Sequence, residues 1–216
     1  MIRQLYHKKA VVIIICMAAF IVSCKKPSEQ QLPVYNPSDF NQTFVDKNLH
    51  NISKDHKVAD FNLINQNGRT VTQEDYRDKI YVTDFFFTSC KTICPIMTNN
   101  MVKVQEAFLM NNDIMFLSLS VTPDIDSISR LREYATNKGV IDAKWNVTTG
   151  NKKHIYELAR KSYFAVAEQG DGGLQDFIHT TKFILVDKKK RIRGAYDGTD
   201  TKEIKRLIKD INILKN

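Results

Sequence analysis

Residues 85–97 read FFFTSCKTICPIM and join the end of an apolar strand pattern to the start of a helix pattern. Cys90 and Cys94 stand at this junction, directly before Pro95. Three uses are open for such a pair: a structural disulfide, a redox couple, or two soft ligands for a metal ion. The surrounding sequence predicts the fold first and then narrows this choice.

Strand and helix patterns continue on both sides of the cysteine pair. Residues 59–76 alternate polar and apolar around Asn67-Gly68, which predicts a hairpin, and residues 79–87 predict a buried strand. Other patterns predict helices over 95–111, 128–139, 151–163 and 201–214, and strands over 113–121, 181–187 and 191–197. A strand followed by a helix, with cysteines at the junction, indicates an α/β fold of the thioredoxin-like kind, a three-layer sandwich with a mixed central sheet and flanking helices.

The N-terminus predicts export. Basic residues precede an apolar run over residues 10–22, which is shorter than the roughly 18 residues of a membrane-spanning helix and fits a secretory signal. Ile21-Val22-Ser23-Cys24 resembles a bacterial lipobox, so we expect residues 1–23 to be a lipoprotein signal peptide and Cys24 to carry lipid. This implies an exported protein, anchored to the membrane and facing the periplasm. An uncleaved short anchor is the alternative.

Two segments after the signal are interpreted from composition. Residues 24–57 are polar, contain prolines and show no sustained period, which predicts an extended linker before a domain over 58–216. Docking of its later half, residues 40–50, on the domain is left open by the sequence. The net charge is +8, and its densest basic cluster, DKKKRIR at 187–193, has no interleaved aromatic residues. We interpret this cluster as a solvated turn and expect no nucleic-acid partner.

The domain keeps two thiols, because Cys16 belongs to the signal and Cys24 to the lipid anchor. A disulfide that closes so short a loop stabilises little, so a structural staple is the weakest use. The residue before a proline avoids the helical region, which predicts Cys94 at or near the helix N-cap and Pro95 as the first helical residue. The N–H groups of a helix start, aided by Lys91, favour the thiolate that attacks disulfides and binds metals.

A metal would need a further ligand. Two thiolates suit Cu(I), an added imidazole gives a three-coordinate soft site, and structural zinc would require a fourth ligand that we do not find near the motif. His50, His56 and His154 are interpreted as exposed surface residues. His179 ends a Gly-rich loop before a strand, where ligands often converge, although a histidine in such a place is more often structural.

The stretch TSCKTICP, residues 88–95, resembles the CxxxCP motif of the Sco (SenC) family, the copper chaperones of cytochrome c oxidase assembly. NQNGRTVT before it, LSVTPDID and WNVTTG after it, and His179 fit the same family from about Val58 to the C-terminal helix. The resemblance implies that Cys90, Cys94 and His179 bind copper, as Cu(I) or Cu(II), and that the cysteines cycle to a disulfide. It also implies the dinuclear copper site of oxidase subunit II as the target.

Several positions depart from the family pattern. Lys91 and Thr92 stand between the cysteines where an acidic residue is frequent, Thr122 stands where aspartate is common, and Ile178 precedes the histidine in place of aspartate. Because groups around a metal ligand orient it, we expect a thinner acidic surrounding and an effect on affinity or docking.

Two functions remain open. One is a membrane-tethered copper-binding assembly factor that delivers copper to, or prepares the cysteines of, oxidase subunit II or another copper or thiol protein. The alternative is an enzyme, a thiol-disulfide oxidoreductase acting on exported proteins without copper transfer, which would not need His179. A peroxidase hypothesis rests on Thr88 before Cys90 and is the weakest.

Four other residues near the motif are interpreted from their sequence pattern. Met97, Met101 and Met110 recur at helical spacing and are assigned to the core rather than to a copper site. Asp84 lies inside the buried strand pattern, where it could pair with a lysine or tune the thiols from beneath the helix.

Overall fold

The computed structural model describes residues 31–40, 45, 47–52, 54–166 and 177–215. The predicted signal peptide and Cys24 lie outside these residues. Residues Leu32–Asn216 form one compact unit, and the architecture below is that of this unit. Among the described residues, no helix has both the length and the apolar character needed to cross a membrane.

In the described part of the chain, seven strands form one mixed sheet in the order β2-β1-β5-β4-β3-β6-β7. The strands are β1 (Asn62–Asn65), β2 (Thr70–Thr72), β3 (Ile80–Phe86), β4 (Ile114–Ser120), β5 (Trp145–Thr149), β6 (Lys182–Val186) and β7 (Ile192–Asp197). The three central strands β3, β4 and β5 are parallel, and the outer pairings are antiparallel. The predicted mixed sheet is therefore confirmed.

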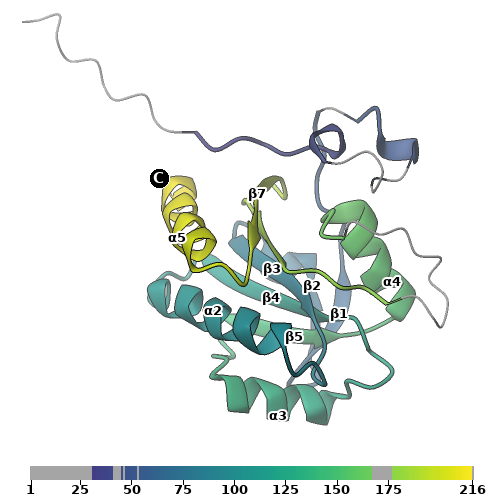
Figure 1. Cartoon of the computed structure of the whole chain (residues 1–216), viewed down its shortest axis with the longest axis vertical. Coiled ribbons are helices and arrows are strands. Elements are labelled where there is room, and N and C mark those ends of the chain that lie inside the picture. The colour runs from purple at the N-terminus through teal and green to yellow at the C-terminus, as the bar shows by residue number, and fades with distance from the viewer. Residues whose placement is uncertain (1–30, 41–44, 46, 53, 167–176, 216) are drawn as a thin grey trace, which may run out of the picture. The chain divides into compact units, whose positions relative to one another are not determined.

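Helices cover both faces of the sheet (Figure 1). One face carries α2 (Ile93–Ala107), α3 (Ile128–Lys138) and α5 (Thr201–Lys215), and the other carries α4 (Lys152–Glu157), which continues as a π-helical turn (Leu158–Ser162). Short 3-10 turns lie at Pro37–Asp39, Lys47–Leu49 and Gln73–Tyr76. This arrangement is the expected three-layer sandwich.

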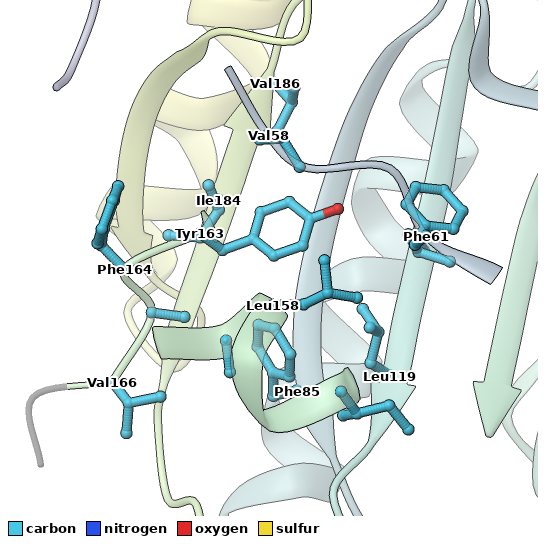
Figure 2. Close-up of a cluster of buried hydrophobic side chains, with 14 of the residues drawn as sticks. Val58, Phe61, Phe85, Leu119, Leu158, Tyr163, Phe164, Val166, Ile184 and Val186 are labelled. Carbon is cyan, nitrogen blue, oxygen red and sulfur yellow. The ribbon is translucent and has the colours of Figure 1, made fainter. Parts of the chain in front are cut away.

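Two apolar cores lie between these layers because successive side chains of a strand point to opposite faces. The α4-side core includes Tyr81 and Phe85 of β3, and Figure 2 shows Phe85, Leu119, Tyr163 and Ile184 gathered within it. The α2-side core includes Val82 and Phe86 of β3 together with Met97, Met101, Trp145 and Leu207. All seven residues of β3 are buried, as expected for a central strand covered on both faces.

The predicted hairpins are confirmed. Gly68 has φ +74° in the turn between β1 and β2, a conformation that glycine adopts easily, and its N–H donates to the Asn65 carbonyl at 2.9 Å. The basic cluster is the turn between β6 and β7, where Arg191 and Arg193 both contact the buried carboxylate of Asp187, at 2.7 and 2.9 Å. Its cations are therefore largely engaged within the fold.

One strand was not predicted, and the docking of the segment before the domain, which the sequence left open, is observed. Strand β5 forms from WNVTT, for which the sequence pattern predicts no strand, and it lies between β4 and β1. The segment before Val58 is also not simply extended, because its described part packs on the domain. Tyr35 N–H donates to the Ile192 carbonyl at 2.9 Å, and Val45 is 1% exposed.

Candidate functional site

The two cysteines lie where the chain leaves β3 and enters α2. The N-cap of α2 is Thr92, so Cys94 is the second helical residue and Pro95 the third. Our placement of Pro95 at the first helical position is therefore wrong by two residues. The first turn tolerates the proline because its N–H groups have no partner within the helix. The Cys94 N–H instead donates to Cys90 Sγ at 3.3 Å, so the sulfur acts as a cap.

The two thiols, which are both free, differ in charge because their surroundings differ. Partial burial of Cys90 opposes ionisation, but N–H groups of Cys94, Thr92 and Ile93 and the Cys94 thiol donate towards its sulfur, and the pKa of Cys90 falls to about 7. Cys94 is 6% exposed, and this burial, with the nearby Cys90 sulfur, raises its pKa to about 12. At neutral pH the site can therefore hold one partly buried thiolate, at Cys90, beside one buried thiol, at Cys94.

His179 lies just before β6 and is exposed. Its ring contacts Phe177, with centroids 4.4 Å apart, and approaches the edge of Phe87, with centroids 6.2 Å apart. Phe87 is also tied to the cysteine loop, because its carbonyl accepts the Cys90 N–H at 3.2 Å. Phe87 is thus the residue that links His179 to the cysteines.

The structure does not assemble the three predicted ligands into one cluster. Within the described ranges, no three His, Cys, Asp or Glu side chains are grouped closely enough to hold a metal ion. Cys90 and Cys94 are brought together, whereas His179 is brought only to their aromatic neighbour Phe87. The assignment of His179 as a ligand therefore stays a prediction.

The other histidines pack against the domain, so their assignment as exposed surface residues is wrong. His56 Nε2 lies 2.8 Å from the Ser162 carbonyl oxygen, and burial lowers its pKa. His50 Nε2 lies 2.7 Å from the Val45 carbonyl oxygen. His154 Nε2 accepts a long hydrogen bond, 3.4 Å, from a backbone N–H of β1. Each of these rings is therefore engaged by a backbone group of the fold.

Asp84 lies beneath the cysteines in the α2-side core and is 2% exposed. Ser118 Oγ donates to its carboxylate at 2.5 Å, and Trp145 Nε1 donates to the same hydroxyl at 2.8 Å. Burial raises the pKa of Asp84 to about 7. Its charge in turn contributes to raising the pKa of Cys94 and of Tyr134. The sequence left two roles open for Asp84, pairing with a lysine or tuning of the thiols. Tuning of the thiols agrees with this geometry, because the described hydrogen-bond partner of Asp84 is Ser118 and not a lysine.

Asp126 was not recognised from the sequence as part of the site. Its carboxylate is fully buried and accepts hydrogen bonds from the Thr88 N–H (3.2 Å), Thr88 Oγ1 (2.5 Å), Ser120 Oγ (2.5 Å) and Thr122 Oγ1 (3.0 Å). Thr88 begins the loop that carries Cys90. The acidic surrounding is therefore less thin than we expected, because an aspartate reaches the cysteine loop from a neighbouring loop.

Two pockets differ in their relation to this site. A pocket of about 270 Å³ borders the cysteine loop and is lined by Thr88, Ser89, Arg130, Glu133, Tyr134 and Asn137. A larger pocket of about 420 Å³ is lined by none of the candidate ligands, and charges at its edge pair with one another, as Lys190 does with Asp60 at 2.7 Å. Of these two pockets, the smaller one adjoins the cysteine loop.

Comparisons with known proteins identify relatives over most of the chain. A model of the SCO1/SenC family matches residues 50–215. The SCO1 protein homolog of Bacillus subtilis is 32% identical over 158 residues, which cover 72% of this chain and 81% of that protein. The crystal structure of a SCO1/SenC family lipoprotein from Bacillus anthracis aligns with a TM-score of 0.66 at 29% identity, covering 74% of this chain and 96% of the other.

A further solved structure is similar. It is that of BsSco, described as a member of the Sco family of cytochrome c oxidase assembly proteins in which a disulfide switch was identified. It aligns with a TM-score of 0.64 at 31% identity, covering 74% of this chain and 94% of the other.

Proposed function

Because this chain belongs to the SCO1/SenC family, we propose that it is a copper-binding assembly factor of cytochrome c oxidase. Copper is its cargo, held by the sulfurs of Cys90 and Cys94 and the imidazole of His179. It delivers the ion to the dinuclear copper site of oxidase subunit II, or prepares the cysteines of that site. The observation that carries the proposal is the sulfur pair at the start of α2, with Cys94 N–H 3.3 Å from Cys90 Sγ.

The properties of the two sulfurs support copper as the ion. Thiolates select soft Cu(I), and Cys90 already ionises near neutral pH. Cys94, with its pKa raised to about 12, must lose a proton when it binds the ion and regains it on release. Binding through Cys94 is therefore weakened by this proton, which favours transfer of the ion to a partner with more acidic thiols.

The position of His179 supports a third ligand. Its exposed ring lies against Phe177 and Phe87, and the Phe87 carbonyl is bonded to Cys90. An imidazole added to two thiolates completes the three-coordinate site that Cu(I) accepts. The aromatic rings would exclude water from one side of that site.

The membrane anchor is part of this proposal. Residues 1–23 act as a lipoprotein signal peptide, and Cys24 carries the lipid that holds the domain at the membrane on the periplasmic side. A B. anthracis relative is itself described as a lipoprotein.

A second function, thiol-disulfide exchange, is favoured by the difference between the two thiols. The Cys90 thiolate attacks a disulfide of an exported partner and releases one partner thiolate. Cys94 then attacks the mixed disulfide, so that the partner is reduced to two thiols and Cys90–Cys94 is oxidised. Exchange needs no imidazole, and His179 therefore separates the two functions.

The test is a titration of the reduced mature chain, residues 24–216 with Cys24→Ser, with Cu(I) against a chromophoric chelator. We expect one tight equivalent for the wild type, its loss in Cys90→Ala and Cys94→Ala, and binding weaker by about tenfold or more in His179→Ala, or at least ~1.4 kcal/mol. His154→Ala is the matched control and should bind as the wild type does. If His179→Ala also binds as tightly as the wild type, three-coordinate copper handling is wrong and the oxidoreductase function takes its place.

A further inference from the structure

We infer that Asp126 is a positioning residue for the cysteine site, whose carboxylate fixes the loop between β3 and α2 so that Cys90 Sγ meets the first turn of α2. This inference deepens the proposed function and rests on it for copper, but the geometry of the thiol pair can be tested without copper.

Asp126 and Thr88 are brought together by the topology of the sheet. β3 and β4 are parallel neighbours paired along their whole length, from Ile80 with Ile114 to Phe86 with Ser120. The loops that follow them therefore leave the same edge of the sheet. The Val121 N–H continues the pairing by donating to the Phe86 carbonyl at 2.8 Å, which leaves Thr88 opposite the β4–α3 loop.

The hydrogen bonds to the Asp126 carboxylate come from two parts of the chain. Ser120 Oγ, from the last residue of β4, and Thr122 Oγ1, from the loop of Asp126 itself, orient the carboxylate. The backbone N–H and hydroxyl of Thr88 come from the cysteine loop and reach the two different carboxylate oxygens. A buried carboxylate is costly unless it is well hydrogen-bonded, and four donors meet that need. A carboxylate that served only the β4–α3 loop would not require the two bonds from Thr88.

The two hydrogen bonds from Thr88 to Asp126 are called the clamp below. A short series of hydrogen bonds joins this clamp to Cys90 Sγ. Asp126 holds Thr88, the Phe87 carbonyl beside it accepts the Cys90 N–H at 3.2 Å, and Cys90 Sγ accepts the Cys94 N–H at 3.3 Å. The Phe87 ring also lies against His179. Asp126 therefore holds the loop of Phe87, the residue that links His179 to the cysteines.

Positioning of this kind has a measurable consequence. When two thiols are held in register, their effective concentration in disulfide formation rises, because less conformational freedom is lost when the bond closes. Release of Thr88 from Asp126 should lower this effective concentration. A general loss of stability elsewhere in the domain should not.

The experiment equilibrates the mature chain, residues 24–216 with Cys24→Ser, with reduced and oxidised glutathione. In this reaction one oxidised glutathione accepts two electrons from Cys90 and Cys94, which become the disulfide, and two reduced glutathiones are released. We compare the wild type with Asp126→Asn, Thr88→Val and the double variant. Asp210→Asn is the control. Asp210 lies on α5, is also buried, and its carboxylate accepts a hydrogen bond from the Tyr196 hydroxyl at 2.8 Å.

We expect the equilibrium constant for disulfide formation to fall by about fivefold or more in Asp126→Asn and to fall in Thr88→Val. The double variant should fall no further than Asp126→Asn alone, because both substitutions remove the same clamp. Asp210→Asn should stay within about twofold of the wild type. If Asp126→Asn lowers the melting temperature but leaves the constant within about twofold, Asp126 serves only the fold and the inference is wrong.

Two further arms keep the outcome clear. If Asp126→Asn does not fold, Thr88→Val decides alone, and an unchanged constant in that variant overturns the inference. The copper titration of the wild type is a separate measurement, so a protein that fails to bind copper but shows the glutathione effect contradicts the proposed function and supports the positioning role.

Discussion

At the scale of single residues, Asp84 is the clearest case of a buried acid retained near reactive sulfurs. Its pKa is raised from 3.8 to about 7 by burial, so the native state gives up stability when the carboxyl ionises. An acid whose pKa is raised in the folded state imposes no cost on the native state below its pKa in the unfolded chain, where the carboxyl is protonated in both states. Asp84 therefore leaves the free energy of unfolding at its full value below about pH 3.8. That full value is lost as pH rises through about 7.

Asp84→Asn should therefore stabilise the protein, with a gain that grows with pH. The amide keeps an oxygen for the Ser118 hydroxyl and carries no charge into the core. We expect a gain on the order of a few kcal/mol in the free energy of unfolding at pH 8, shrinking towards pH 4. Urea unfolding at pH 4, 6 and 8 measures it, and a gain that does not change with pH would contradict the burial of a titrating carboxyl.

The cysteine pair could be predicted from residues alone, but Asp126 could not. Two cysteines before a proline and after a strand pattern carry their own chemical signal. Asp126 is distant from them in sequence, and its role arises only because two parallel strands place their loops side by side. His179 lies between these cases, since the sequence marks it but the structure joins it to the cysteines only through Phe87.

At the scale of elements, methionines of α2 pack the helix onto the core and do not form a metal site. Met97 and Met101 face the α2-side core, at 1% and 0% exposed. Met110 lies beyond the end of the helix and is 89% exposed, so our assignment of that residue to the core is wrong.

Met101 and Met110, one buried and one exposed, give a matched pair of substitutions. Met101→Ala should destabilise the protein by about 2 to 5 kcal/mol, because it leaves a cavity in a packed core. Met110→Ala should change stability by less than ~0.5 kcal/mol and leave copper affinity unaltered. Urea unfolding followed by tryptophan fluorescence measures both, since Trp145 is buried in the same core. Equal effects for the two substitutions would contradict this packing.

Elements with a strong local signal were predicted, and those fixed by tertiary contacts were not. The Asn67-Gly68 turn and the apolar runs of β3 and β4 are local signals. β5 is a short run whose identity as a strand depends on pairing with β4 and β1. The start of α2 was misplaced because the proline rule takes no account of a sulfur that accepts the Cys94 N–H.

At the scale of the whole molecule, the described segment between Leu32 and Val58 acts as part of the domain. Tyr35 pairs with Ile192 on the edge strand β7, and Val45 is buried in the α4-side core. His56 reaches the carbonyl of Ser162 in the π-helical turn, and its ring lies 4.8 Å from that of Phe164. These contacts join the segment to β7 and to the turn that follows α4.

A chain that begins at Val58 should therefore be less stable than the mature chain. We expect its melting temperature to fall by about 5 °C or more, because the buried Val45 and the contacts of Tyr35 and His56 are lost. Thermal unfolding by circular dichroism measures the difference. Val45→Ala in the mature chain should reproduce part of the fall. An unchanged melting temperature would mean that this segment is only a tether.

The order of strands in the sheet also has a consequence for synthesis. β3 ends at Phe86, but the partner that covers one of its edges, β6, begins only at Lys182. A chain made from its N-terminus therefore presents a mostly apolar strand with an open edge until almost the entire protein has emerged. A nascent chain of this kind is vulnerable to aggregation until its last hairpin arrives, and a premature stop codon before β6 should yield a product that proteolysis removes.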